Sequence, residues 1–139
     1  MSPAEEDADT PRARGLAKMQ EVYGFSVDPD DLPGDYAAVT VDHLFGTIWT
    51  RPDLDVRQRR LLTIGALAAL GQPELLEIQF GSALERGELN PAEVREVVLH
   101  LTHYVGWPLS TSMNGVAERV ISGWEKGEEG KTPPGTTPA

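Results

Sequence analysis

The chain has 139 residues, enough for one domain with a single buried core. Its 12 Lys and Arg stand against 22 Asp and Glu, a formal net charge of -10, which argues against nonspecific attraction to nucleic acid or to anionic membranes. The absence of cysteine excludes disulfides, thiolate metal sites and cysteine nucleophiles.

The two ends of the sequence are predicted to be disordered tails. Residues 1–9 are rich in Glu and Asp, and residues 127–139 are rich in Gly, Pro and Thr. The first residues lack the apolar core of a secretory signal, and no apolar run approaches the roughly 20 residues of a membrane span. We therefore expect a cytoplasmic protein with one helical domain over residues 10–126.

The first half of the domain is predicted to begin with two helices. Thr10 followed by Pro11 is a helix-start signal, and Gly24 can end this first helix in a left-handed turn. A second apolar stripe runs from Tyr36 to Ile48 and stops at Arg51-Pro52.

The third predicted helix, over residues 55–70, is apolar nearly all round, which is typical of a buried helix. We expect the other helices to pack as antiparallel hairpins around it. A chain this short cannot comfortably cover so much apolar surface, which favours an oligomer. The alternative is a monomer in which this helix is the central core element.

A fourth and a fifth helix follow. Gln72-Pro73 opens the fourth, and Gly87 provides its left-handed stop. The stretch Asn90–Glu93 resembles a capping box with Pro at the first helical position, and apolar residues continue at helical spacing to Val105.

A sixth helix completes the predicted set. Gly106-Trp107-Pro108 breaks the fifth helix, and Ser110 or Thr111 can cap a further one that continues through Trp124. No stretch alternates as a strand would, so the sequence predicts an all-α fold of about six helices.

Two blocks of sequence carry a family resemblance. The first is Phe45-Gly46-Thr47-Ile48-Trp49-Thr50-Arg51-Pro52-Asp53-Leu54, followed by Arg57, Arg59, Leu61 and Thr63. The second comprises residues 83–87, 91–97 and 104–108. In order and spacing these blocks resemble the carboxymuconolactone decarboxylase family, in the γ-carboxymuconolactone decarboxylase-like branch of the alkylhydroperoxidase D-like superfamily. The resemblance covers about Arg14 to Trp124. It implies an all-α, alkylhydroperoxidase D-like fold, assembly as a homotrimer or homohexamer, and pockets near the subunit contacts.

The resemblance also separates two kinds of chemistry. In the thiol peroxidase branch of the family, cysteines stand at the positions of Gln72 and Leu75, a histidine at Gln79 and a glutamate at Arg60. None of these redox residues is present here, so thiol peroxidase activity is not expected. Decarboxylases of the family commonly carry a histidine where this chain has Gln79, whereas His43 matches a histidine seen in them.

The decarboxylase resemblance implies a cofactor-free carboxy-lyase acting on a small carboxylated lactone such as γ-carboxymuconolactone. Such a site must hold the carboxylates, stabilise a developing oxyanion and protonate a ring carbon. Gln79 is the candidate oxyanion donor; the alternative is a polar residue that faces solvent or a subunit contact. His43 is the candidate acid; the alternative is a structural histidine at a helix cap or an interface.

Further side chains are candidates for substrate binding because guanidinium groups grip carboxylates and aromatic rings can close over a ring-shaped ligand. These candidates are Trp49, Arg51, Arg60, His103, Tyr104 and Trp107. The arginines could instead form a solvated face or an interface set of ion pairs, and Tyr104 and Trp107 could be ordinary core residues at the end of the fifth helix. His100 and His103 share a helix face, but without a third ligand we predict no metal and no other cofactor.

Two other functions stay open at this point. The replacement of the family histidine by Gln79 favours an oligomeric binding protein that has kept the pocket and lost the chemistry. An isomerase or cyclase that moves protons on a ring could use His43, His103 and Tyr104.

Overall fold

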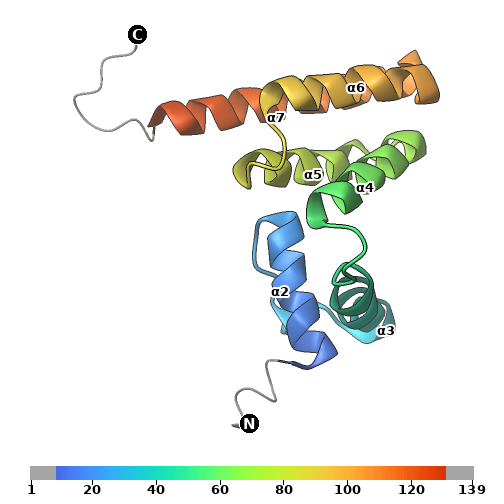
Figure 1. The fold of residues 1–139 in the computed structure, drawn as a ribbon, viewed down its shortest axis with the longest axis vertical. Helices are drawn as coiled ribbons and strands as arrows, with labels where there is room; N and C mark the ends of the chain where they lie inside the picture. The colour runs from blue at the N-terminus through green and yellow to red at the C-terminus, as the bar shows by residue number, and fades with distance from the viewer. Residues whose placement is uncertain (1–8, 131–139) are drawn as a thin grey trace. The chain divides into compact units, whose positions relative to one another are not determined.

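Helices make up all of the regular structure in the computed structural model, which describes residues 9–130 (Figure 1). Within these residues there is no strand, so the predicted all-α class is confirmed. The chain divides into a first unit, residues 1–63, and a second unit, residues 64–139. The predicted tails lie largely outside the described residues, and the domain limits 10–126 stay a prediction. No helix in residues 9–130 is long and apolar enough to cross a bilayer.

The first unit begins with α2 (Pro11–Tyr23), whose ends agree with the sequence signals. The Thr10 side chain accepts a hydrogen bond from the backbone N–H of Ala13 at 3.1 Å, and Gly24 closes the helix at φ 83°. Both features satisfy backbone groups that a helix end leaves without partners.

The second predicted helix is present but has an unexpected form. A short 3-10 turn, η1 (Pro29–Asp31), and the short helix α3 (Gly34–Ala38) lead into η2 (Val39–Ile48), which is a π-helix. The backbone N–H of Trp49 bonds the carbonyl of Leu44 at 2.9 Å, five residues earlier, as this wider helix requires.

Helix α2 packs closely along η2 in the first unit (Figure 1, blue against cyan to teal). The contact is glycine-lined: a Cβ built on Gly15 would lie 1.9 Å from the carbonyl oxygen of Val41, and one on Gly46 would lie 2.4 Å from that of Pro11. Only residues without a side chain allow two backbones to approach this closely. The apolar core beside this contact consists of Met19, Val22, Val41, Phe45 and Trp49.

Helix α4 (Val56–Leu70) crosses the boundary between the units and differs from its predicted role. The expectation of a helix buried all round is wrong within the single chain, because Leu62 and Leu70 are 66% and 71% exposed. The packing of the other helices around it stays a prediction. The closest helix pairs are α2 with η2, α5 with α7 and α6 with α7. A helix that is apolar on every side carries no sequence signal for the side that will be covered.

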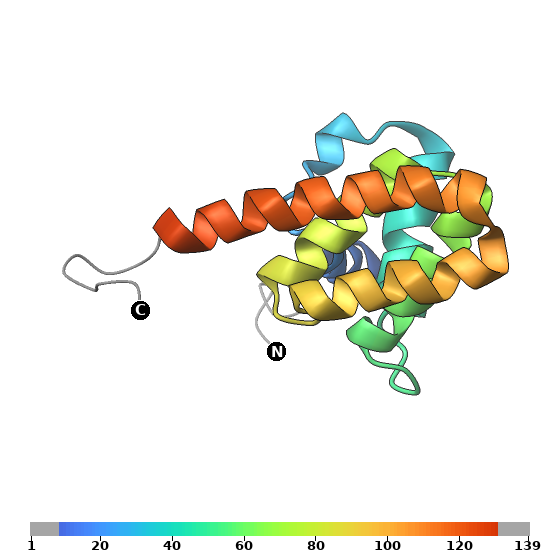
Figure 2. The ribbon, with the colours of Figure 1, turned by 90° about the horizontal axis from the view of Figure 1, so that it is seen from above.

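The second unit is built from α5 (Pro73–Glu85), α6 (Pro91–Val105) and α7 (Trp107–Gly130). Asn90 and Glu93 form the predicted capping box, with backbone to side-chain hydrogen bonds of 2.8 and 3.0 Å. Helices α6 and α7 run antiparallel as a hairpin around Gly106, which has φ 88° (Figure 2). The core of this unit contains Leu76, Phe80, Ala83, Leu84, Val94, Val98, Met113, Val116, Ala117 and Ile121.

The start of α7 corrects the predicted cap. The helix begins at Trp107, and the hydroxyls of Ser110 and Thr111 donate to the Trp107 carbonyl at 3.2 and 2.8 Å. These side chains therefore bond back into the first turn, a local alternative to capping that Ser and Thr often adopt. The other end of α7 includes residues 127–130, which the sequence placed in the tail.

Candidate functional site

His43 lies on the π-helix η2 in the first unit and is exposed. Its neighbours Val41 and Phe45 are buried, and they anchor the opposite side of the helix in the core of the unit. The ring of His43 is therefore presented outward from a helix that is held on its other side. An exposed imidazole can exchange protons with solvent, as a general acid must after each turnover.

Asp42, next to His43, is held by an arginine of α2. Arg12 Nε donates to Asp42 Oδ1 at 2.5 Å and Arg12 Nη2 donates to Asp42 Oδ2 at 3.2 Å. This hydrogen-bonded pairing lowers the pKa of the Asp42 carboxyl and raises the pKa of the Arg12 guanidinium. The two-point geometry fixes the direction of both planar groups as well as their distance.

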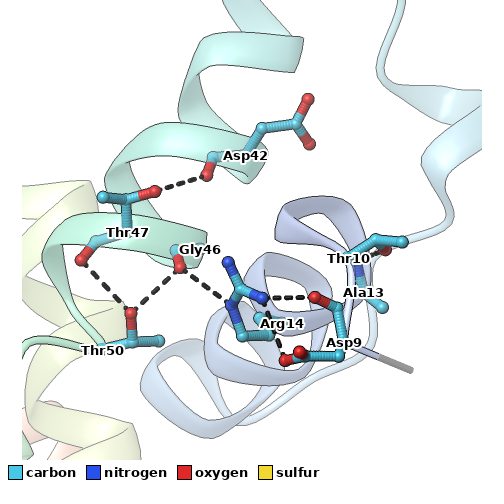
Figure 3. Close-up of polar contacts among 8 residues, drawn as sticks. All are labelled: Asp9, Thr10, Ala13, Arg14, Asp42, Gly46, Thr47 and Thr50. Carbon is cyan, nitrogen blue, oxygen red and sulfur yellow. Dashed lines mark hydrogen bonds and ion pairs between the residues drawn. The ribbon is translucent and has the colours of Figure 1, made fainter. Parts of the chain in front are cut away.

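A second arginine of α2 contacts the same π-helix further along (Figure 3). Arg14 Nε donates to the carbonyl oxygen of Gly46 at 3.5 Å, and its Nη1 pairs with Asp9 Oδ1 at 3.1 Å. The hydroxyl of Thr50 donates to the same Gly46 carbonyl at 3.0 Å, and that of Thr47 to the Asp42 carbonyl at 3.2 Å. Side-chain hydrogen bonds thus reach η2 at the carbonyl oxygens of Asp42 and Gly46.

Of the other candidates in the first unit, two are buried and one is exposed. Trp49 is buried and stacks on Phe45 with ring centroids 5.9 Å apart. Arg60 is fully buried, and its Nη1 donates to the carbonyl oxygen of Val22 at 2.8 Å. Arg51 is exposed, and its own carbonyl accepts from Arg59 Nη2 at 3.1 Å. Of the three, Arg51 has the exposed guanidinium.

Gln79 lies on α5 in the second unit and is buried, with only 5% of its surface exposed. The alternative of a side chain facing solvent is therefore wrong. Ser82, one turn further along α5, is also buried, and both residues have interaction partners within the protein. A neutral amide is one of the few polar groups that can be held in such an enclosed position at low cost.

The aromatic candidates at the junction of α6 and α7 are exposed. Tyr104 and Trp107 are 77% and 64% exposed, so the alternative reading of ordinary core residues is wrong. The rings of His103 and Trp107 meet edge to face at 5.8 Å, and His100 lies 5.1 Å from Tyr104. Across residues 9–130 no three acidic or histidine side chains are grouped as metal ligands would be.

A hollow of about 290 Å³ lies beside Trp107, between α6 and α7. Its lining includes three hydroxyl side chains that the sequence did not indicate as part of a pocket: Thr102, Ser110 and Thr111. Each of these hydroxyls donates to a backbone carbonyl of its own helix. Their spacing in the sequence matches no binding motif. Only the packing of α6 against α7 shows that they line the same hollow.

The structure thus brings His103 and Trp107 together in the second unit, where Gln79 and Tyr104 also lie. In the first unit, the main finding is the set of contacts from α2 to the π-helix that carries His43. Sequence reasoning missed Arg12 and Asp42, which are 30 positions apart and carry no local signal of their pairing.

Comparison with known proteins gives the chain its relatives. The model of the carboxymuconolactone decarboxylase family matches residues 34–119. A 4-carboxymuconolactone decarboxylase of Acinetobacter baylyi is 31% identical over 92 residues, which are 66% of this chain and 68% of that protein. The nitrosuccinic acid decarboxylase npaB of Metarhizium robertsii is 38% identical over 89 residues, 60% of this chain and 59% of that protein. No solved structure gives a significant match.

The family match begins at α3 and extends into α7, so it includes both His43 and Gln79. It spans more than half of the residues, and both relatives are decarboxylases. The chain belongs to the carboxymuconolactone decarboxylase family.

Proposed function

We propose that the protein is a cofactor-free decarboxylase of a small dicarboxylic acid in which an electron acceptor lies next to, or in conjugation with, the carbon that loses carbon dioxide. The observation that carries this proposal is the pair of decarboxylase relatives with different substrates. Carboxymuconolactone and nitrosuccinic acid both have two carboxyl groups, and each has an acceptor, a conjugated lactone carbonyl or a nitro group. These shared features define a substrate class that includes both compounds.

The proposed reaction needs no oxidant or reductant. The bond between the carboxylate carbon and the neighbouring carbon breaks, carbon dioxide leaves, and the electron pair spreads onto the oxygen of the acceptor. A proton then adds to carbon and restores a neutral acceptor. The protein must stabilise the oxygen charge and supply the proton.

Gln79 is our candidate for the oxyanion donor. Its amide is neutral and enclosed on α5, where hydrogen bonds act in a setting of low dielectric constant and are correspondingly strong. An amide cannot release a proton near neutral pH, so the acid must be another group. His43 is our candidate acid because an exposed imidazole can be reprotonated from solvent.

Arg51 is our first choice for holding a substrate carboxylate, because its guanidinium is exposed. Arg60 already gives one N–H to a backbone carbonyl, and Trp49 is packed in the core. For His103, Tyr104 and Trp107 we propose contact with the apolar part of the substrate, which their exposed rings support.

We further propose that the protein acts as a homotrimer or homohexamer. Leu62 and Leu70 on α4 are mostly exposed, and leucines at such positions lose apolar contact with water when copies associate. A pocket completed by a neighbouring copy would agree with the family resemblance.

The test is direct incubation of the purified protein with γ-carboxymuconolactone or with nitrosuccinate, without added metal or thiol. Released carbon dioxide and, for the lactone, loss of ultraviolet absorbance are measured. We expect saturable turnover that falls at least tenfold in His43→Ala and in Gln79→Ala, but not in the control His100→Ala. Gln79→His should preserve or raise turnover. If the folded protein decarboxylates neither compound, the proposed activity is wrong; if Gln79→Ala retains full turnover, the oxyanion role is wrong.

A binding protein or an isomerase on the same fold is the second candidate, favoured by the amide at Gln79 in place of the family histidine. Titration calorimetry and the incubation assay together separate these functions from decarboxylation. Saturable binding heat without release of carbon dioxide would identify a binding protein. A changed ultraviolet spectrum of the product without release of carbon dioxide would identify an isomerase.

A further inference from the structure

The π-helix η2 is an unusual element on which to carry a proton donor. It has 10 residues, whereas π-type turns usually occur singly inside α-helices and often mark functional sites. Because each backbone bond spans five residues, the direction of His43 depends on whether this wider turn is kept. A change to ordinary α-helical bonding would rotate the ring around the helix axis.

The contacts that keep the wider turn come from α2 and from the π-helix itself. Arg12 binds the Asp42 carboxylate from one side. Arg14, also on α2, reaches the Gly46 carbonyl (Figure 3). Asp42 directly precedes His43, and Gly46 follows it by less than one π-turn. The two arginines therefore contact η2 on both sides of His43 in the sequence, the residue whose ring direction depends on the π-turn.

Arginines in these positions are not explained by the stability of α2. Both lie in the first turns of the helix, where the N–H groups carry partial positive charge and an added cation is unfavourable. No acidic residue is present in that first turn. Arg14 also pairs with Asp9, just before the helix. For Arg12, the pairing with Asp42 of η2 is the compensating interaction.

Helix α2 also lies outside the segment that matches the family model, which begins at residue 34. The close contact of Gly15 with Val41 leaves almost no room for α2 and η2 to move relative to each other. An ion pair across so close a contact fixes the position of Asp42, and with it that of η2, relative to α2.

We propose that Arg12, acting through Asp42, is a positioning residue for His43. The ion pair holds the π-helix in its wide form, and this form directs the imidazole toward the substrate. The proposal rests on the proposed function only in assigning the acid role to His43.

The expected signature is a loss of rate without a matching loss of stability. An ion pair with both side chains about 40% exposed adds little to folding, so its removal should leave the protein folded. Misplacing a catalytic group by about 1 Å can lower the rate about 100-fold. We expect kcat to fall about tenfold or more in Arg12→Met, with KM within about twofold of the wild type.

The experiment compares Arg12→Met, Asp42→Asn and the exchanged pair Arg12→Asp with Asp42→Arg. Lys18→Met is the control, because Lys18 is a cation of the same helix whose ion pair with Glu21, at 2.7 Å, stays within α2. The first readout is the ring resonances of His43 in carbon–proton NMR spectra, assigned by their loss in His43→Asn. The second readout is kcat and KM.

The proposal requires that both single variants shift the His43 resonances, that the exchanged pair returns them toward the wild type, and that Lys18→Met leaves them in place. Unmoved His43 resonances in a folded Arg12→Met variant would overturn it. Because NMR needs no turnover, a failure of the decarboxylase assay counts against the proposed function alone. Normal kcat in a variant with shifted resonances would also overturn the link to catalysis.

Discussion

The glycine contact between α2 and η2 can be tested by adding one methyl group. In Gly15→Ala the new Cβ would lie 1.9 Å from the carbonyl oxygen of Val41 and 2.7 Å from its carbonyl carbon. These are backbone atoms, which cannot move aside by rotating a side chain. The substitution must therefore separate the two helices or tilt one of them.

The expected size of the effect follows from two opposing terms. Overpacking of a close contact costs about 1–3 kcal/mol, and rigid backbone on the far side places Gly15→Ala at the upper end. Alanine gains about 1 kcal/mol over glycine in a helix. The net loss is about 2 kcal/mol, which corresponds to a fall in Tm of about 8 °C if each kcal/mol shifts it by about 4 °C in a chain of this size.

Gly123→Ala is the matched control for this substitution. Gly123 lies in α7, and nothing is within 4 Å of the place its Cβ would take. The same chemical change should therefore stabilise the protein by about 0.5–1 kcal/mol. Thermal unfolding followed by far-ultraviolet circular dichroism, with Trp fluorescence in parallel, measures both. If Gly15→Ala is as stable as Gly123→Ala, the backbones of α2 and η2 are not in close contact at Gly15.

Three further predictions use other features of the fold. Asn90→Ala removes one half of the capping box on α6 and should cost about 1 kcal/mol in urea unfolding, whereas an unchanged midpoint would show that the cap adds nothing. Because the Arg12 ion pair lowers the pKa of Asp42 in the folded state, its stabilisation is present above the unfolded pKa of about 3.9 and is lost as the pH falls through the lower folded value. Asp42→Asn should therefore lose less stability than the wild type between pH 5 and pH 2, and parallel curves would contradict the pairing. Leu70→Glu places a charge on the exposed apolar side of α4 and should reduce the assembled mass measured by light scattering; an unchanged mass would exclude this side as the subunit contact.

Helix ends were the part of the fold that sequence reasoning predicted best. Thr10, Gly24 and the capping box of Asn90 and Glu93 act locally, through backbone groups only a few residues away. Such signals do not depend on the tertiary structure. The start of α7 was missed because Ser110 and Thr111 can bond either forward as caps or back to a carbonyl, and the sequence does not distinguish the two.

The π-helix and the surroundings of His43 could not be predicted in the same way. Apolar spacings of three to five residues fit an α-helix and a π-helix alike. The contacts around the π-turn include a pair of residues 30 positions apart, Arg12 and Asp42, on different helices. Likewise, the apolar residues of α4 indicated a helix but not which of its sides stays exposed.

The hairpin of α6 and α7 is unequal in length, and this has a practical consequence. At about 1.5 Å per residue, the 24 residues of α7 span about 36 Å and the 15 residues of α6 about 22 Å. The last turns of α7 extend past the beginning of α6, and residues 125–129 are exposed (Figure 2). Amide protons there should exchange with solvent sooner than those near Ile121, which is buried. The overhang is therefore a suitable place for a fluorescent label or an immobilising tag.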